Sequence, residues 1–199
     1  MRQNKELANE LIQMKKRDLE LREQLLKEGT LFEGYPIEME KVHIENGLRL
    51  TNIMEEFGWP NENKVGKEGA DAAWLILQHA ISLPQLQRNA LSILEVEMKE
   101  GKIEPYQWAH LFDRISFFER KPQRYGTQFD WDDEEKMNPW KIEDEENVDQ
   151  RRAEIGLPPL QEEMKRIQKE IEENDVSPPS SMKKRMAEVH EWRERVGWL

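Results

Sequence analysis

The chain has 199 residues, which is enough for one core of ordinary size with appendages. Its 41 acidic residues outnumber its 30 basic residues, and the net charge of -11 argues against a general affinity for nucleic acid. Cysteine is absent, which excludes disulfides, thiolate metal sites and cysteine nucleophiles. Neither a membrane span nor a signal peptide is visible, so we expect an acidic, cytoplasmic protein with no membrane partner.

A long charged helix is predicted at the N-terminus, over residues 3–28. A thin apolar stripe runs along it, and Gly29 follows as a stop. The stripe consists of Leu7, Leu11, Met14, Leu21 and Leu25. So thin a stripe is typical of a helix that lies across a domain or pairs with another chain. We therefore expect a homodimer through this helix as one alternative.

The centre of the chain predicts a buried helix over residues 70–83. This stretch is apolar on nearly every face, which is typical of a helix in the middle of a core. A polar, glycine-bearing loop over residues 61–69 leads into it, and Pro84 marks its exit. Helices at 37–57, 85–99 and 105–119 are predicted to surround it, each with an apolar face.

The second half has no further long apolar helix. Residues 121–131 lack a helical period and predict an extended loop or a short strand, in which Gly126 permits a positive φ. An acidic stretch with a turn at residues 138–140, a short helix at 146–155 and charged helices at 160–173 and 182–196 follow.

The predicted fold class is therefore all-α. We expect a charged N-terminal helix at residues 1–29, a helical core domain at 30–160 and charged C-terminal helices at 161–199. A Pro/Ser linker at 175–181 interrupts the last part, so residues 175–199 are expected to be removable.

Several sequence strings resemble one bacterial family of unknown function, of the type called domain of unknown function 6624. The strings are Gly58-Trp59-Pro60, the stretch from Gly69 to Ala80 with its AAWL and QHA motifs, Asp113-Arg114, and QRYGTQF at residues 123–129. The resemblance covers about residues 20 to 160. It implies no reaction, because such families carry no assigned activity.

Polar residues on apolar faces predict where a site lies. We expect His79 and His43 to face one pocket, with His79 as an acid/base and His43 as a second proton carrier or orienting group. At least one of Asp113, Arg114 and Gln128 is expected to join the two histidines, and binding groups are expected around them. The predicted binding residues are Asn46, Gln78, Asp113, Arg114, Gln123, Tyr125 and Gln128. The alternative is that both histidines are core residues satisfied by their neighbours.

No cofactor is assigned from the sequence. Glu40, His43, His79 and Asp113 are the residue types that bind a divalent metal, but their spacing matches no compact metal motif, so no metal ligand is assigned. No glycine-rich phosphate-binding motif is present. The leading hypothesis is a small enzyme with a histidine acid/base, acting on a polar small molecule or a modified side chain. The alternative is a non-catalytic interaction or regulatory module with a buried polar network.

Overall fold

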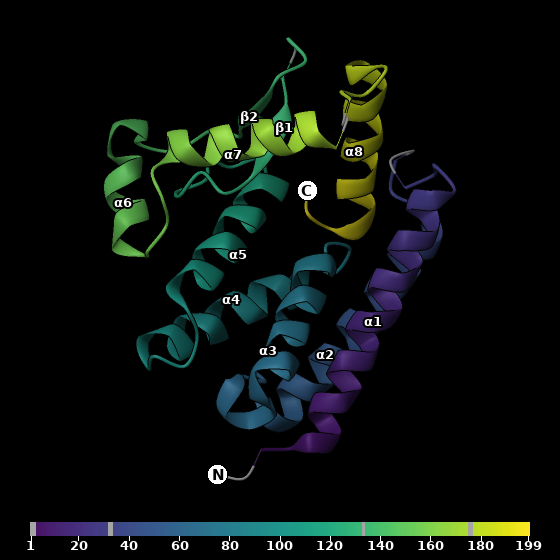
Figure 1. Ribbon diagram of the computed structural model, residues 1–199, viewed down its shortest axis with the longest axis vertical. Coiled ribbons are helices and arrows are strands. Elements are labelled where there is room, and N and C mark those ends of the chain that lie inside the picture. Colours follow the sequence, from purple (N-terminus) through teal and green to yellow (C-terminus); the bar gives the residue numbers. More distant parts are fainter. Residues whose placement is uncertain (1–2, 32–33, 133, 175–176) are drawn as a thin grey trace. The chain divides into compact units, whose positions relative to one another are not determined.

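The computed structural model describes the chain except residues 1–2, 32–33, 133 and 175–176. It confirms the all-α fold class, with one small sheet added (Figure 1). The helices are α1 Lys5–Lys27, α2 Ile37–Phe57, α3 Glu62–His79, α4 Pro84–Lys99, α5 Pro105–Phe118, α6 Val148–Glu154, α7 Leu160–Glu173 and α8 Met182–Val196. A 3-10 turn, η1 Glu145–Asn147, and strands β1 Phe129–Trp131 and β2 Met137–Pro139 complete the structure.

The chain forms two compact units, Met1–Glu104 and Pro105–Leu199, and each is described by itself. The charged N-terminal helix lies within the first unit, and the charged C-terminal helices lie within the second. The predicted linker over residues 175–181 falls partly outside the described residues.

Helix α1 is an integral part of the first unit. It packs along α3 more extensively than along any other element and also contacts α2 (Figure 1). Its apolar stripe is used in this packing, since Leu7, Leu11 and Leu25 are buried. Arg49 of α2 adds a bidentate ion pair to Glu10, with N–O distances of 2.5 and 3.0 Å. Burial of the stripe fixes which side of α1 faces α2 and α3.

Helix α3 begins earlier and ends earlier than the sequence predicts. The side chain of Asn61 caps its N-terminus by accepting a hydrogen bond from the Lys64 amide, so much of the expected loop is helical. Gly66 interrupts the helix with φ 73° and ψ 169°. The helix ends at His79 instead of residue 83, because the residue before Pro84 is disfavoured in helical conformation and Pro84 itself starts α4.

At Gly47 the backbone of α2 lies close to side chains of the turn that follows α3. A Cβ atom added at Gly47 would lie 2.6 Å from Leu83 Cδ1 and 3.0 Å from Ala80 Cβ. A larger residue at position 47 would require Leu83 to move. His43 lies one turn before Gly47 on α2, and His79 directly precedes Ala80, so the contact brings the two histidines together.

The small sheet of the second unit replaces the turn predicted at residues 138–140. Strands β1 and β2 are antiparallel, with Phe129 opposite Pro139 and Trp131 opposite Met137. Pro139 is tolerated because each strand of a two-stranded sheet is an edge strand. The extended segment predicted over residues 121–131 is borne out in β1, and Gly126 has φ +67° as expected.

The end of the chain packs against α5. Trp198 is 4 % exposed and stacks on Phe118 with ring centroids 5.1 Å apart. Trp192 of α8 contacts the same ring edge-on, and the Arg193 guanidinium lies 4.9 Å from the centre of the Phe117 ring. These contacts argue against the expectation that residues 175–199 are dispensable.

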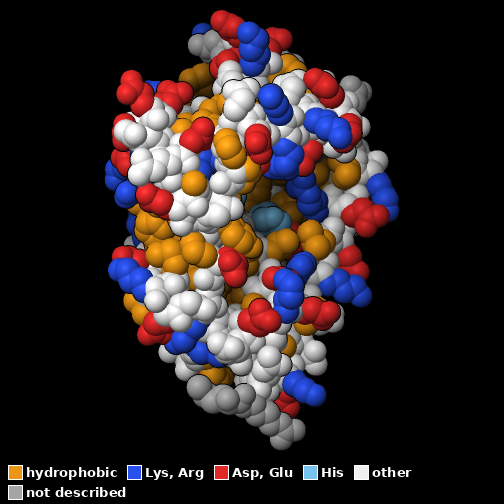
Figure 2. All heavy atoms as spheres, turned by 60° about the vertical axis from the view of Figure 1, so that its left-hand side comes forward, with side chains coloured by type: hydrophobic (Ala, Val, Ile, Leu, Met, Phe, Trp, Pro, Cys, Tyr) orange, Lys and Arg blue, Asp and Glu red, His pale blue; other side chains and the backbone are white. Residues whose placement is uncertain are grey.

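Charge is spread over the surface in both signs. On the face drawn in Figure 2, acidic and basic side chains alternate with apolar ones. Many are paired one helical turn apart, as are Lys67 with Asp71 and Lys99 with Glu95. No helix in the described part of the chain is both long enough and apolar enough to cross a membrane.

Candidate functional site

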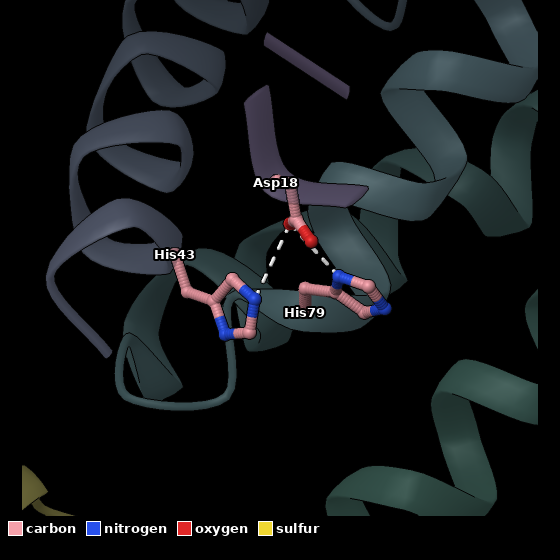
Figure 3. Close-up of side chains that lie close together, drawn as sticks. All are labelled: Asp18, His43 and His79. Carbon is pink, nitrogen blue, oxygen red and sulfur yellow. Dashed lines mark hydrogen bonds and ion pairs between the residues drawn. The ribbon is translucent and has the colours of Figure 1, made fainter. Parts of the chain in front are cut away.

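Three helices of the first unit each contribute one side chain to a compact cluster. Asp18 comes from α1, His43 from α2 and His79 from the last residue of α3 (Figure 3). Asp18 Oδ2 lies 2.8 Å from His79 Nδ1 and 3.2 Å from His43 Nε2, and the two ring centroids are 4.8 Å apart. The prediction that His43 and His79 face a common space is therefore confirmed, with Asp18 as the residue that joins them.

Asp18 is a buried carboxylate without a basic partner of the usual kind. Its exposed fraction is 0 %, and among the described residues its ion-pair partners are the two histidines, with no lysine or arginine. Burial acts to raise the pKa of Asp18, but the two nearby rings outweigh it and hold this pKa well below its usual range. Oδ1 has no hydrogen-bond partner in the described part of the chain. The carboxylate is thus charged and buried, and only one of its two oxygens has a partner among the described residues.

His43 is held from the side opposite Asp18. Its Nδ1 lies 2.6 Å from the Tyr35 hydroxyl, and Tyr35 packs in turn against an apolar cluster of Leu25, Leu31 and Met39. Its buried Nε2 is near Asp18, but it makes no hydrogen bond within the described residues. The His43 ring is therefore fixed in place, while its Nε2 lies near the Asp18 carboxylate without a hydrogen bond to it.

His79 is the member of the cluster that reaches the surface. Its side chain is 29 % exposed, against 9 % for His43 and 0 % for Asp18. Its Nδ1 is hydrogen-bonded to the Asp18 carboxylate, an arrangement that fixes the orientation of an imidazole ring and its tautomer. The second ring nitrogen, Nε2, has no hydrogen bond to any described residue, so it is the atom left for a ligand.

The other predicted residues of this unit lie around the cluster in different roles. Asn46 is buried and donates a hydrogen bond to the Met14 carbonyl, which ties α2 to α1. Gln78 is half-buried beside His79 on α3. Glu40, one turn before His43, accepts a hydrogen bond from the Ser82 hydroxyl at 2.6 Å. Glu40 does not belong to the cluster of Asp18, His43 and His79.

Asp113 of α5, in the second unit, anchors the loop that follows the helix. Its carboxylate accepts hydrogen bonds from the backbone N–H groups of Arg124, Tyr125 and Thr127 and from the Thr127 hydroxyl, at 2.7–3.2 Å. Burial raises the pKa of Asp113 above its usual range, although these donors act to lower it. The geometry is that of a structural anchor, since both oxygens are occupied.

The predicted residues of the loop are also bonded within the second unit. Gln123 is fully buried, donates to the carbonyls of Gln128 and Trp140, and accepts from the Gln128 amide. Tyr125 is buried, and the Gln128 side chain donates to the Thr127 hydroxyl. Burial lowers the pKa of Arg114 to about 10, so it remains a cation at neutral pH. The ligand-binding roles expected for these residues stay predictions.

Sequence reasoning missed Asp18, although the chain carried a signal. The apolar stripe of α1 runs Leu7, Leu11, Met14, Leu21, Leu25, and the missing step between Met14 and Leu21 is residue 18. An aspartate at an inward position of an amphipathic helix is costly to bury and therefore marks a partner on the neighbouring helix. In a helix crowded with glutamate and lysine, one inward-facing acid is hard to tell from the surface charges around it.

Comparison with known proteins places the chain without giving it an activity. No curated protein and no solved structure matches it. The model of a family described as a family of unknown function, DUF6624, matches residues 5–176. The match extends beyond the resemblance over residues 20–160 and includes α1 with Asp18. This chain therefore belongs to the DUF6624 family, and the cluster of Asp18, His43 and His79 lies within the matched region.

Proposed function

We propose that this protein is a small enzyme that moves protons, with His79 as the acid/base and Asp18 as its buried partner. The substrate class is a polar small molecule or a modified side chain. The observation that carries the proposal is the pairing of a fully buried carboxylate with the inner nitrogen of a histidine whose side chain is 29 % exposed.

The pairing assigns a role to each nitrogen. An ionised carboxylate only accepts hydrogen bonds, so the proton at this contact belongs to His79 Nδ1. In the neutral ring, Nε2 then carries the lone pair and can take a proton from a substrate. Asp18 stabilises the imidazolium that forms, as a carboxylate does beside other catalytic histidines. A base of this kind works near neutral pH.

His43 supports the pair as an orienting group. It sits against the other side of Asp18 Oδ2, and its own outer nitrogen is occupied by the Tyr35 hydroxyl. A sealed structural network would leave each buried polar atom with a partner. Asp18 Oδ1 and His43 Nε2 have none among the described residues, which favours a site that takes a ligand over an interaction module.

The test begins with a thermal-shift screen of polar metabolites, followed by turnover assays on every compound that raises the melting temperature. In His79→Gln, turnover should fall by about 10²–10⁴-fold, the usual contribution of a general acid/base. The matched control is His190→Gln, which changes a partly exposed histidine of α8 and should leave turnover unchanged. Full turnover in His79→Gln would contradict the proposal.

A second measurement needs no substrate. Diethyl pyrocarbonate acylates accessible, unprotonated imidazole nitrogens, and peptide mass spectrometry reports the extent at each histidine. We expect His79 to react at Nε2 and His43 to be protected, because His43 is 8 % exposed and its Nδ1 is bonded to Tyr35. Rapid acylation of His43 with protection of His79 would reverse the assigned roles.

A further inference from the structure

We propose that Asp18, His43 and His79 bind one divalent transition-metal ion, with Zn²⁺ as the probe. The inference deepens the proposed function, because it names the cofactor of the same centre. It rests on that function for the role of the centre only, since metal binding itself is measured without a substrate.

The positions of the donor atoms support the site. One carboxylate oxygen of Asp18, one nitrogen of His43 and one nitrogen of His79 all lie within 4.8 Å of one another. Ligands about 2.0–2.1 Å from a tetrahedral Zn²⁺ are roughly 3.3 Å apart, so small side-chain shifts bring three such atoms onto one ion. Because α1, α2 and α3 all contact one another, the donors are held on a packed frame.

Two atoms of the cluster have no hydrogen-bond partner among the described residues, and a bound cation could fill that role. Asp18 Oδ1 and His43 Nε2 are buried and without hydrogen bonds in the described part of the chain. Both have lone pairs available when His43 carries its proton on Nδ1, and a metal ion accepts such lone pairs. Buried charges in proteins are paired or coordinate metals, and Asp18 has no described lysine or arginine partner.

Tyr35 supplies the outer contact that a metal-binding histidine usually has. Such a histidine hydrogen-bonds through its second nitrogen to a neighbouring group, which fixes its tautomer. The Tyr35 hydroxyl oxygen lies 2.6 Å from His43 Nδ1 and can accept this N–H. The same contact leaves the Nε2 lone pair of His43 aimed at the space shared with Asp18 and His79.

The ligand types indicate the class of metal. Two imidazoles and one carboxylate suit zinc, iron(II), manganese and their neighbours, and three protein ligands leave a coordination position open. Calcium and magnesium prefer oxygen ligands throughout, so they are disfavoured here. Metal binding would therefore move the base role within the same centre. With His79 Nδ1 as a ligand and Nε2 protonated, a water molecule on the open position, whose pKa zinc lowers to about 7, would take the role that His79 Nε2 has in the metal-free centre.

The experiment is isothermal titration of the full-length, untagged, chelator-treated protein with Zn²⁺, repeated with Co²⁺ to follow coordination by visible absorption. We expect one ion per chain. The variants Asp18→Asn, His43→Gln and His79→Gln should each lose at least the 10- to 100-fold in affinity that even an outer contact is worth. Tyr35→Phe should lose affinity within that range, because it removes only the outer contact. The controls Asp71→Asn and His190→Gln change an exposed aspartate and a partly exposed histidine outside the cluster, and both should bind as the wild type does.

Wild-type protein alone supplies a second readout in case a variant fails to fold. Bound Zn²⁺ should protect His79 from acylation by diethyl pyrocarbonate and leave His190 reactive. The absence of a stoichiometric site in the wild type, or equal affinity in the three ligand variants and the controls, would overturn the inference. Turnover that survives chelation yet disappears in His79→Gln would also overturn it, while the proposed acid/base function would stand.

Discussion

Two buried aspartates, one in each compact unit, are both 0 % exposed but have different surroundings. Asp113 has both oxygens occupied by donors from residues 124–127 of the same unit. Asp18 has one oxygen between two histidines and the other without a partner in the described residues. A carboxylate with both oxygens hydrogen-bonded holds a loop in place, whereas one with a free oxygen can still bind a proton or a cation. Burial alone does not distinguish a site from an anchor; the count of satisfied atoms does.

The largest expected effect concerns the packing of the C-terminal residues against α5 in the second unit. Trp198→Ala should lower the free energy of unfolding by roughly 3–5 kcal/mol, because it removes a buried aromatic side chain that stacks on Phe118 of α5. Urea denaturation followed by circular dichroism measures the change. Met186→Ala, an exposed position on α8, is the control. A Trp198→Ala midpoint equal to that of the control would restore the expectation that the tail is dispensable.

The comparison of the two aspartates is tested by making the same substitution in each. Asp113→Asn replaces an oxygen that accepts N–H groups with an NH₂ group, so we expect a loss of about 3 kcal/mol as charge-assisted bonds are broken and donors left unpaired. Asp18→Asn should cost only about 1 kcal/mol, because one of its oxygens has no bond to lose. Urea midpoints of both variants decide the order. A larger loss for Asp18→Asn would mean that the Asp18 cluster is also a structural anchor.

A smaller effect concerns pH-dependent stability through His110, a histidine of the second unit. His43 and His79 lie beside a carboxylate, whereas His110 of α5 is largely buried and lies near Arg114. Burial, aided by the charge of Arg114, lowers the pKa of His110 from 6.5 to about 4, against an opposing contribution from Glu163 and with smaller ones from Arg152 and Arg166. Between pH 6.5 and 4 the unfolded chain binds a proton that the folded chain does not, so stability falls as pH falls.

His110→Gln should remove this acid sensitivity. From pH 7 to pH 5 the wild type should lose about 2 kcal/mol more than the variant, at roughly 1.4 kcal/mol per pH unit of linkage. Urea midpoints at several pH values measure the difference, with His190→Gln as the control. Parallel pH profiles for wild type and His110→Gln would show that folding does not lower the pKa of His110.

The sequence by itself determined most helices of this protein and the proximity of two histidines. Apolar periodicity and terminal glycine or proline give α2 at Ile37–Phe57, α7 at Leu160–Glu173 and α8 at Met182–Val196, as the structure has them. These features are local, because a helix is specified by residues three and four apart and by its ends. The meeting of His43 and His79 also followed, since polar residues on two apolar helices must find each other or lose hydrogen bonds.

Only the tertiary structure decided which carboxylate stands between the histidines. The sequence predicts that Asp113, Arg114 or Gln128 joins the histidines, but the carboxylate between them is that of Asp18, 61 residues before His79. The pairing depends on how α1 packs along α3 and α2, and such packing is set by the complementarity of whole helix surfaces. An inward-facing aspartate gives a local hint, yet its partner is chosen by a non-local contact that no periodicity encodes.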